Sequence, residues 1–225
     1  MRDDLLAVRT PWVNFHVLRD GNGLHLIDAG FIGGRKQLAL ALRQRGWERE
    51  PIRGILITHG HLDHILNVGQ LARETGAWIA APRLDADHFS GNPRYRGLSR
   101  ITGMAEGMGR PLLDFQPFEP TRWLDDGEEI DVWQGLKTVH LPGHTAGHMG
   151  LFSERHRLLF CGDLFASFGR WSHWPPAVFN HDGPLNRRSA VHALELDLEG
   201  IIPNHSDGAA PELHLERLRN LIRSH

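Results

Sequence analysis

Residues 54–64 read GILITHGHLDH, and this stretch decides how the rest of the chain is interpreted. Its first four residues, 54–57, are apolar and predict a short buried strand that runs directly into Thr58. The four side chains that follow are all good metal ligands within six residues: His59, His61, Asp63 and His64. Because ligands of open α/β sheets bind beyond the carboxyl ends of the strands, this position suits a metal site.

The spacing of these four side chains favours a common centre. His59 and His61 lie two residues apart, so an extended chain projects both imidazoles to the same side. Asp63 and His64 lie where the chain turns into the next predicted helix, from which they can reach a neighbouring point. Burying so many polar groups without partners would cost about 1–3 kcal/mol for each group. We therefore interpret the stretch as a metal site, and its nitrogen and oxygen donors suit zinc, manganese or iron.

The length, charge and cysteine content of the chain limit the classes of protein to which it can belong. The chain has 225 residues, which suits one domain, and its 25 Lys and Arg nearly balance its 27 Asp and Glu. A net charge of −2 without a charge run argues against a nucleic-acid partner. The single cysteine, Cys161, excludes an internal disulfide and favours a reducing compartment. No signal peptide or apolar stretch of ~18 residues stands out, so we expect a cytoplasmic protein without a membrane partner.

Strand and helix patterns alternate on both sides of the motif. Strands are expected at residues 13–18, 24–27, 54–57, 77–80, 122–124, 129–132, 136–141, 149–153 and 158–161. Helices are expected at residues 36–44, 62–74, 184–194 and 211–223. Residues 83–120 are rich in Gly, Pro and Arg and predict a loop-and-helix insertion. Strand-rich halves that each end in helices predict two sheets packed face to face with helices outside.

The motif His59-x-His61-x-Asp63-His64 resembles the signature of the metallo-β-lactamase superfamily. Other segments resemble the remaining motifs of that family in the same order: LIDAG at 26–30, LPGHTAGH at 141–148, FCGD at 160–163 and IPNH at 202–205. The resemblance spans residues 13–206. It implies an α/β (α+β) fold, a four-layer αββα sandwich of two mixed β-sheets with outer helices. We expect one domain over residues 1–225, with the insertion at about 83–120 covering the active site.

The resemblance also implies a role for each polar side chain of these motifs. The implied ligands are His59, His61 and His144 for one ion and Asp63, His64 and His205 for a second, with Asp163 bridging both. Asp28 is not a ligand in the family and would orient a metal-bound imidazole by accepting its hydrogen bond. A turn-forming Asp before Gly30 is the alternative. Asn204 stands where the family usually has Gly, and Asn tolerates the left-handed backbone better than most residues.

Two divalent ions, expected to be zinc with manganese or iron as alternatives, imply hydrolysis. The positive charge of the two ions exceeds the negative charge of Asp63, Asp163 and a bridging hydroxide. This excess of positive charge lowers the pKa of the bound water toward ~7. The surplus also stabilises an oxyanion. We therefore expect a dinuclear hydrolase in which a metal-bridging hydroxide attacks a small ester, thioester or lactone, with Asp63 and Asp163 as catalytic carboxylates.

The insertion and residues 165–182 are expected to select a small-molecule substrate. Four arginines lie between residues 91 and 110 against one acid, a patch that suits an anionic group and is too small for a nucleic acid. Aromatic residues after Asp163 predict a pocket wall. The candidate substrate contacts are Arg96, Arg100, Phe168, Arg170, Trp171 and Trp174. The alternatives are a solvated loop and aromatic side chains that fill space between the outer helices.

Several branches of the superfamily remain open at the level of sequence. Asp163 argues against a true β-lactamase, and residues 162–165 with 169–170 resemble glyoxalase II in part. Lactone hydrolases of the family use a tyrosine near the metals, and the only tyrosine here is Tyr95, in the insertion. The alternative function is a persulfide dioxygenase that binds one iron through His59, His144 and Asp163. A nuclease is a further alternative.

Overall fold

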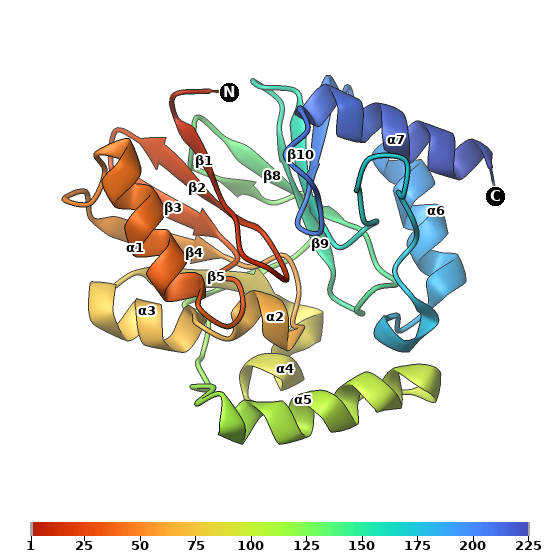
Figure 1. The fold of residues 1–225 in the computed structure, drawn as a ribbon, viewed down its shortest axis with the longest axis horizontal. Helices are drawn as coiled ribbons and strands as arrows, with labels where there is room; N and C mark the ends of the chain where they lie inside the picture. Colours follow the sequence, from red (N-terminus) through yellow and green to blue (C-terminus); the bar gives the residue numbers. More distant parts are fainter. Residues whose placement is uncertain (1, 225) are drawn as a thin grey trace.

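Two mixed β-sheets lie face to face in the computed structural model, which describes residues 2–224 (Figure 1). The first sheet contains, in spatial order, β1 (Leu5–Val8), β2 (Phe15–Asp20), β3 (Gly23–Ile27), β4 (Ile52–Leu56), β5 (Trp78–Pro82) and β6 (Arg122–Leu124). The second contains β11 (Gly200–Pro203), β10 (Leu158–Gly162), β9 (Met149–Ser153), β8 (Leu136–His140) and β7 (Glu129–Ile130). The predicted sandwich of two mixed sheets is therefore confirmed.

Strand direction places the functional segments at one edge. β3, β4, β5 and β6 run parallel to one another, whereas β1, β2 and β3 form antiparallel pairs. In the second sheet only β10 and β11 are parallel. The parallel strands of each sheet end together, so the loops that follow them gather at the same edge of the sandwich.

Helices cover both outer faces of the sandwich. The first sheet is covered by α1 (Gly34–Arg45) and α3 (Val68–Thr75), and the second by α6 (Gly183–Ala193) and α7 (Pro211–Arg223) (Figure 1). The remaining helical segments are α2 (Leu62–Ile65), η1 (Arg83–Asp85), α4 (Ala86–Phe89), η2 (Gly97–Ser99), α5 (Arg100–Leu112) and η3 (Ala177–Phe179). Within residues 2–224 no helix combines the length and apolarity needed to cross a bilayer.

Side chains along the central strands point alternately to the two faces of each sheet, and the two faces pack into separate hydrophobic cores. Leu26 and Ile55 point outward to the core under α1 and α3, whereas their neighbours Ile27 and Leu56 point inward. Successive strand residues face opposite sides of a sheet, and here both sides are buried. Strands buried on both faces read as continuous apolar runs, which is why residues 54–57 look uniformly apolar in the sequence.

The structure differs from the sequence prediction in one helix and two strands. The predicted helix at 62–74 is two helices, because Asn67 lies between them and its amide donates to the carbonyls of Ala29, Gly30 and Phe31. Strands β1 and β11 have only four residues each and were not predicted. The predicted loop-and-helix insertion does contain a helix, the 13-residue α5. Met1 and His225, the ends of the predicted domain, lie outside the described residues.

Candidate metal centre

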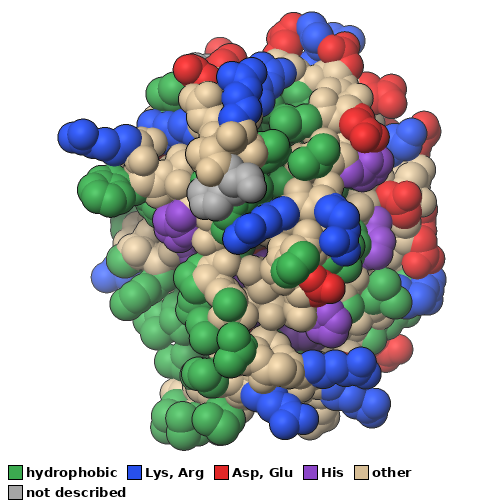
Figure 2. All heavy atoms as spheres, turned by 90° about the vertical axis from the view of Figure 1, so that its right-hand side faces the viewer, with side chains coloured by type: hydrophobic (Ala, Val, Ile, Leu, Met, Phe, Trp, Pro, Cys, Tyr) green, Lys and Arg blue, Asp and Glu red, His purple; other side chains and the backbone are tan. Residues whose placement is uncertain are grey.

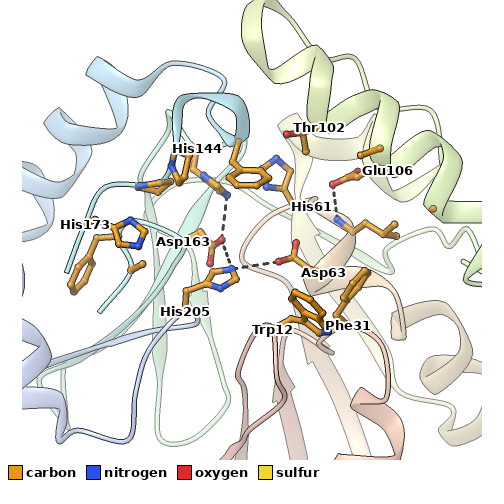
Figure 3. A pocket seen from close by; sticks show the side chains of 18 of the residues that line it. Trp12, Phe31, His61, Asp63, Thr102, Glu106, His144, Asp163, His173 and His205 are labelled. Atoms are coloured by element: carbon orange, nitrogen blue, oxygen red, sulfur yellow. Dashed lines mark hydrogen bonds and ion pairs between the residues drawn. The ribbon is translucent and has the colours of Figure 1, made fainter. Parts of the chain in front are cut away.

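The seven predicted ligands meet at one edge of the sandwich, although they come from five segments of the chain. Figure 3 labels five of them: His61, Asp63, His144, Asp163 and His205. His59 and His61 follow β4, and the next two ligands belong to α2. His144 lies in the loop between β8 and β9, Asp163 directly follows β10, and His205 follows β11. The ends of parallel strands from both sheets therefore supply the cluster, as expected for a site at their carboxyl ends.

Ligand atoms in this cluster form three overlapping groups, each with all atoms within 4.8 Å of one another. The groups are His59, His61 and His144; His59, His64 and Asp163; and Asp63, His64 and His205. The first and third groups are the two ligand sets implied by the sequence.

Asp163 lies between these two sets. Its Oδ1 is 3.3 Å from Nε2 of His64, and its Oδ2 is 3.4 Å from Nε2 of His144 and 3.0 Å from Nε2 of His205. The carboxylate therefore contacts imidazoles from both sets, which is the position that a bridging ligand requires.

Hydrogen bonds on the far side of three rings turn their Nε2 atoms toward the centre. His64 donates from Nδ1 to the Asp28 carboxylate at 3.0 Å, and His144 donates from Nδ1 to the Asn180 side-chain oxygen at 2.9 Å. The Thr58 hydroxyl gives its hydrogen to Asp28, so its oxygen accepts from Nδ1 of His59 at 3.0 Å. Because each Nδ1 carries the proton, each Nε2 is left as the atom available to a metal.

Four of the inward-facing ligand atoms form no hydrogen bond. Nε2 of His59, His64 and His144, together with Oδ1 of Asp163, are buried and form no hydrogen bond. Unsatisfied buried polar atoms are costly, and here they converge on one small region. A cation at the centre would satisfy them, and imidazole nitrogens with carboxylate oxygens are donors that divalent transition metals accept. The residues present therefore fit a metal site.

The negative charges of Asp63 and Asp163 also favour positive charge at the centre of the cluster. Burial lowers the pKa of His205, but the adjacent Asp163 and Asp63 carboxylates outweigh burial and raise it to about 10. Burial likewise opposes the charged form of His64, and Asp163 and Asp63 again raise its pKa well above the usual value. By contrast, burial and neighbouring imidazoles lower the pKa of His59 well below its usual value. Protons on His64 and His205 supply the charge when metal is absent.

Metal binding is therefore expected to release about two protons at pH 7, one each from His64 and His205, because a metal accepts only the deprotonated nitrogen. Since both pKa values are raised, the apparent metal affinity should increase as the pH rises from 6 to 9, by up to ~100-fold per unit. Calorimetric titration of the metal-free protein in buffers of different ionisation enthalpy measures the proton count. A count near zero would contradict the assigned protonation.

A family model for the metallo-beta-lactamase superfamily matches residues 13–205. The chain belongs to this superfamily. Hydroxyacylglutathione hydrolase GloC of Haemophilus influenzae is 32% identical over 117 residues, which cover 51% of this chain and 50% of that protein. The uncharacterized protein YobT of Bacillus subtilis is 29% identical over 193 residues, covering 82% of this chain and 77% of its own length. The chain thus aligns with only half of the hydrolase.

Solved structures share the fold of this superfamily member. A metallo-beta-lactamase family protein of Thermus thermophilus superposes with a TM-score of 0.70 at 24% identity, covering 98% of this chain and 78% of that one. A second structure, a di-iron-bound form, also gives 0.70 at 24% identity, covering 94% and 97% of the two chains. Identities this low establish the fold alone.

Asn204, the departure from the family motif, does not adopt a left-handed backbone in the described chain; Asp28 does, with φ of 61°. The buried Asn204 amide instead donates to the Asp28 carboxylate at 2.7 Å. The same carboxylate accepts from His64 and from both the N–H and the hydroxyl of Thr58. Asp28 therefore both makes the turn and receives the imidazole hydrogen bond, and the two interpretations of this residue are compatible.

Replacing Asn204 with glycine is expected to weaken metal binding by ~10-fold, because Asp28 loses a donor and holds His64 less firmly. Competition with a chromophoric chelator measures the affinity. Asn92→Gly, at an exposed position in the insertion, serves as the matched control and should leave the affinity unchanged. Equal affinities for the two variants would mean that the Asn204 amide does not contribute.

Asp85 joins the two metal-binding loops and was not predicted. Its buried carboxylate accepts from the Gly60 N–H at 2.9 Å, the Thr145 hydroxyl at 2.6 Å and the Gly147 N–H at 2.7 Å. One side chain from η1 thus ties the loop of His59 and His61 to the loop of His144. His148 ties the same region differently, with Nδ1 donating to Leu141 and Nε2 accepting from the Asp163 N–H.

The insertion contacts the centre through a second network. Glu106 of α5 accepts from the Leu62 N–H at 2.9 Å and pairs with Arg110, also at 2.9 Å. The Tyr95 ring stacks on His61, with ring centroids 5.9 Å apart. Burial, with a contribution from the Glu106 carboxylate, raises the pKa of Tyr95, so its phenol stays protonated. This segment therefore packs directly against a predicted ligand.

A cavity of about 560 Å³ opens beside the cluster, between α5 and the loop after β10. Phe168 lines it, as predicted for an aromatic wall. The other predicted substrate contacts do not line it: Arg96, Arg100, Arg170, Trp171 and Trp174. Trp174 packs against the core beneath α6 and α7, which is the alternative the sequence left open, and Trp171 is 76% exposed.

The predicted basic patch is not assembled at the cavity. Arg110 turns inward to pair with Glu106, and Arg94 pairs with Asp87 on the surface. Arg96 and Arg100 are exposed. Within the described residues 2–224, no lysine or arginine lines the cavity. That these arginines hold an anionic substrate group stays a prediction, and their side chains do not line the cavity.

Proposed function

We propose that the chain is a dinuclear metal-dependent hydrolase that cleaves a small ester, thioester or lactone. The observation that carries this proposal is the convergence of seven His and Asp side chains, three of which present buried Nε2 atoms that form no hydrogen bond. His59, His61 and His144 would hold one divalent ion, and Asp63, His64 and His205 the other. Asp163 would contact both. The metal supplies a hydroxide at neutral pH and polarises the bond to be cleaved.

The chain's own residues have distinct tasks in this proposal. Asp163, with a side chain 8% exposed, holds the two halves of the cluster together. Asp63 is 31% exposed and lines the cavity, so it is the carboxylate that can exchange a proton with a substrate. The hydrogen bonds from Asp28, Thr58 and Asn180 keep three imidazoles oriented, which limits the reorganisation needed during the reaction.

Similarity to hydroxyacylglutathione hydrolase supports a thioester among the candidate substrates, although the aligned region covers only half of that enzyme. The alternative, a mononuclear persulfide dioxygenase, needs only one metal site. The separate ligand group of Asp63, His64 and His205 favours the dinuclear hydrolase over it. Zinc is the proposed metal, with manganese or iron as the alternatives.

The test of this proposal is a substrate panel assayed with metal-loaded protein. It contains uncharged thioesters, acyl-glutathione thioesters, lactones, aryl esters, β-lactams, labelled RNA and glutathione persulfide. Turnover of an ester, thioester or lactone is expected. Oxygen consumption with the persulfide, or cleavage of RNA, without turnover of any of those three classes would overturn the proposal.

A further inference from the structure

The cavity beside the cluster is bounded mainly by apolar groups from four separated segments. One wall is the inner face of α5, with Ala105 and Gly109, together with Leu113 directly after the helix. The opposite wall is the segment after β10, including Phe165, Phe168 and Phe179. A third boundary comes from Trp12, before β2, and Phe31, after β3; both are labelled in Figure 3.

The polar side chains of the cavity outside the ligand cluster already have partners. The Thr102 hydroxyl donates to the Val178 carbonyl at 2.5 Å, which joins α5 to η3. Both oxygens of Glu106 are used, one by the Leu62 N–H and one by Arg110. His173 donates from Nδ1 to the Trp174 carbonyl. With no lysine or arginine in its lining within residues 2–224, the cavity offers little to a charged group.

We infer that this cavity binds a hydrocarbon chain, so that the substrate is an uncharged ester, thioester or lactone with an apolar acyl chain. This inference rests on the proposed function for the type of bond that is cleaved. It adds the kind of acyl group that this bond carries. The cavity's volume lies within the range of small-molecule sites, about 300–1,000 Å³. Burying each methylene of the chain there should raise kcat/KM by up to about fourfold, which corresponds to ~0.8 kcal/mol.

Two positions on α5 allow a matched test of the cavity. Ala105 lines the cavity and is also open to solvent, so a larger side chain there fills space without displacing the core. Met108 is 66% exposed and does not line the cavity. Met104 and Met108 of α5 are exposed apolar side chains. On the face shown in Figure 2, hydrophobic side chains gather at the lower left. Ala105→Trp and Met108→Trp therefore add the same group at an inner and an outer position.

The experiment measures kcat/KM for a series of acyl thioesters of N-acetylcysteamine, from acetyl to decanoyl, and for acyl-glutathione thioesters of the same acyl groups. For the unaltered protein, kcat/KM is expected to rise with chain length before levelling off. Ala105→Trp should lower the ratio of kcat/KM for octanoyl to kcat/KM for acetyl by at least ~10-fold, whereas Met108→Trp should keep the ratio of the unaltered protein. A rate independent of chain length, or a consistent preference for the anionic glutathione series, would overturn the inference.

A second measurement separates this inference from the proposed function. Binding of 1-octanol to the metal-free protein, followed by calorimetry, depends on the cavity and not on hydrolysis. Octanol should bind to the unaltered protein and to Met108→Trp, and binding should be lost in Ala105→Trp. If no ester or thioester is cleaved but octanol binds in this pattern, the proposed function fails and the apolar site stands. Absence of octanol binding in the unaltered protein would overturn the apolar site itself.

Discussion

Asp163→Ala is expected to reduce hydrolysis by at least ~10³-fold and to lower the metal content of the purified protein. The reason is geometric: this one carboxylate lies within 3.0–3.4 Å of imidazoles from both ligand sets. Its removal disconnects the two halves of the cluster and leaves His64 and His205 with less negative charge nearby. The measurements are kcat/KM on the best panel substrate and metal per chain.

The control for this variant is Asp197→Ala, which removes an exposed carboxylate paired with Arg157 on the surface. It should retain full activity and metal content. Far-UV circular dichroism should show both variants folded, because Asp163 belongs to the site and not to the three apolar cores. Full activity of Asp163→Ala would exclude the bridging role.

Glu106→Ala is expected to lower the free energy of unfolding by ~3 kcal/mol. The Glu106 and Arg110 side chains are only 10% and 6% exposed, so the substitution leaves a buried guanidinium without its counter-charge. The Leu62 N–H loses its acceptor at the same time. Urea denaturation of the metal-free protein measures the change, because bound metal would add its own stabilisation.

An exposed ion pair provides the comparison for this prediction. Arg35 and Glu74 are 38% and 47% exposed, so Glu74→Ala should cost only about 0–1 kcal/mol. The double variant Glu106→Leu with Arg110→Leu should recover most of the loss, because it removes both charges together. If Glu106→Ala and Glu74→Ala change the stability equally, the buried pair does not anchor α5 to the metal-binding loop.

The ligand cluster was predictable because four of its seven residues lie close together in the sequence. Four ligands within six residues, placed directly after an apolar strand, indicate a metal site before any contact is known. The resemblance then located His144, Asp163 and His205, which lie far away in sequence and come together only when the two sheets pack. Strands with a strong apolar pattern were also predictable, whereas β1 and β11 were missed; β11 has only Ile201 and Ile202 between Gly200 and Pro203.

The residues that support the cluster could not be predicted in the same way. Asp85, Asn180 and Glu106 reach the site from segments without a motif, and their roles depend on contacts 25 to 62 residues apart in the chain. The arginines of the insertion illustrate the same limit, because their density in sequence does not indicate where each side chain points. The structure turns Arg110 inward and leaves Arg96 and Arg100 exposed.

Metal content tests the central claim most directly. Elemental analysis of protein purified without added metal and without a metal-affinity step gives the identity and number of bound ions per chain. The account predicts two divalent ions per chain, because two separate groups of three ligands meet at Asp163. A single iron per chain that does not increase on incubation with excess zinc, manganese or iron would contradict it.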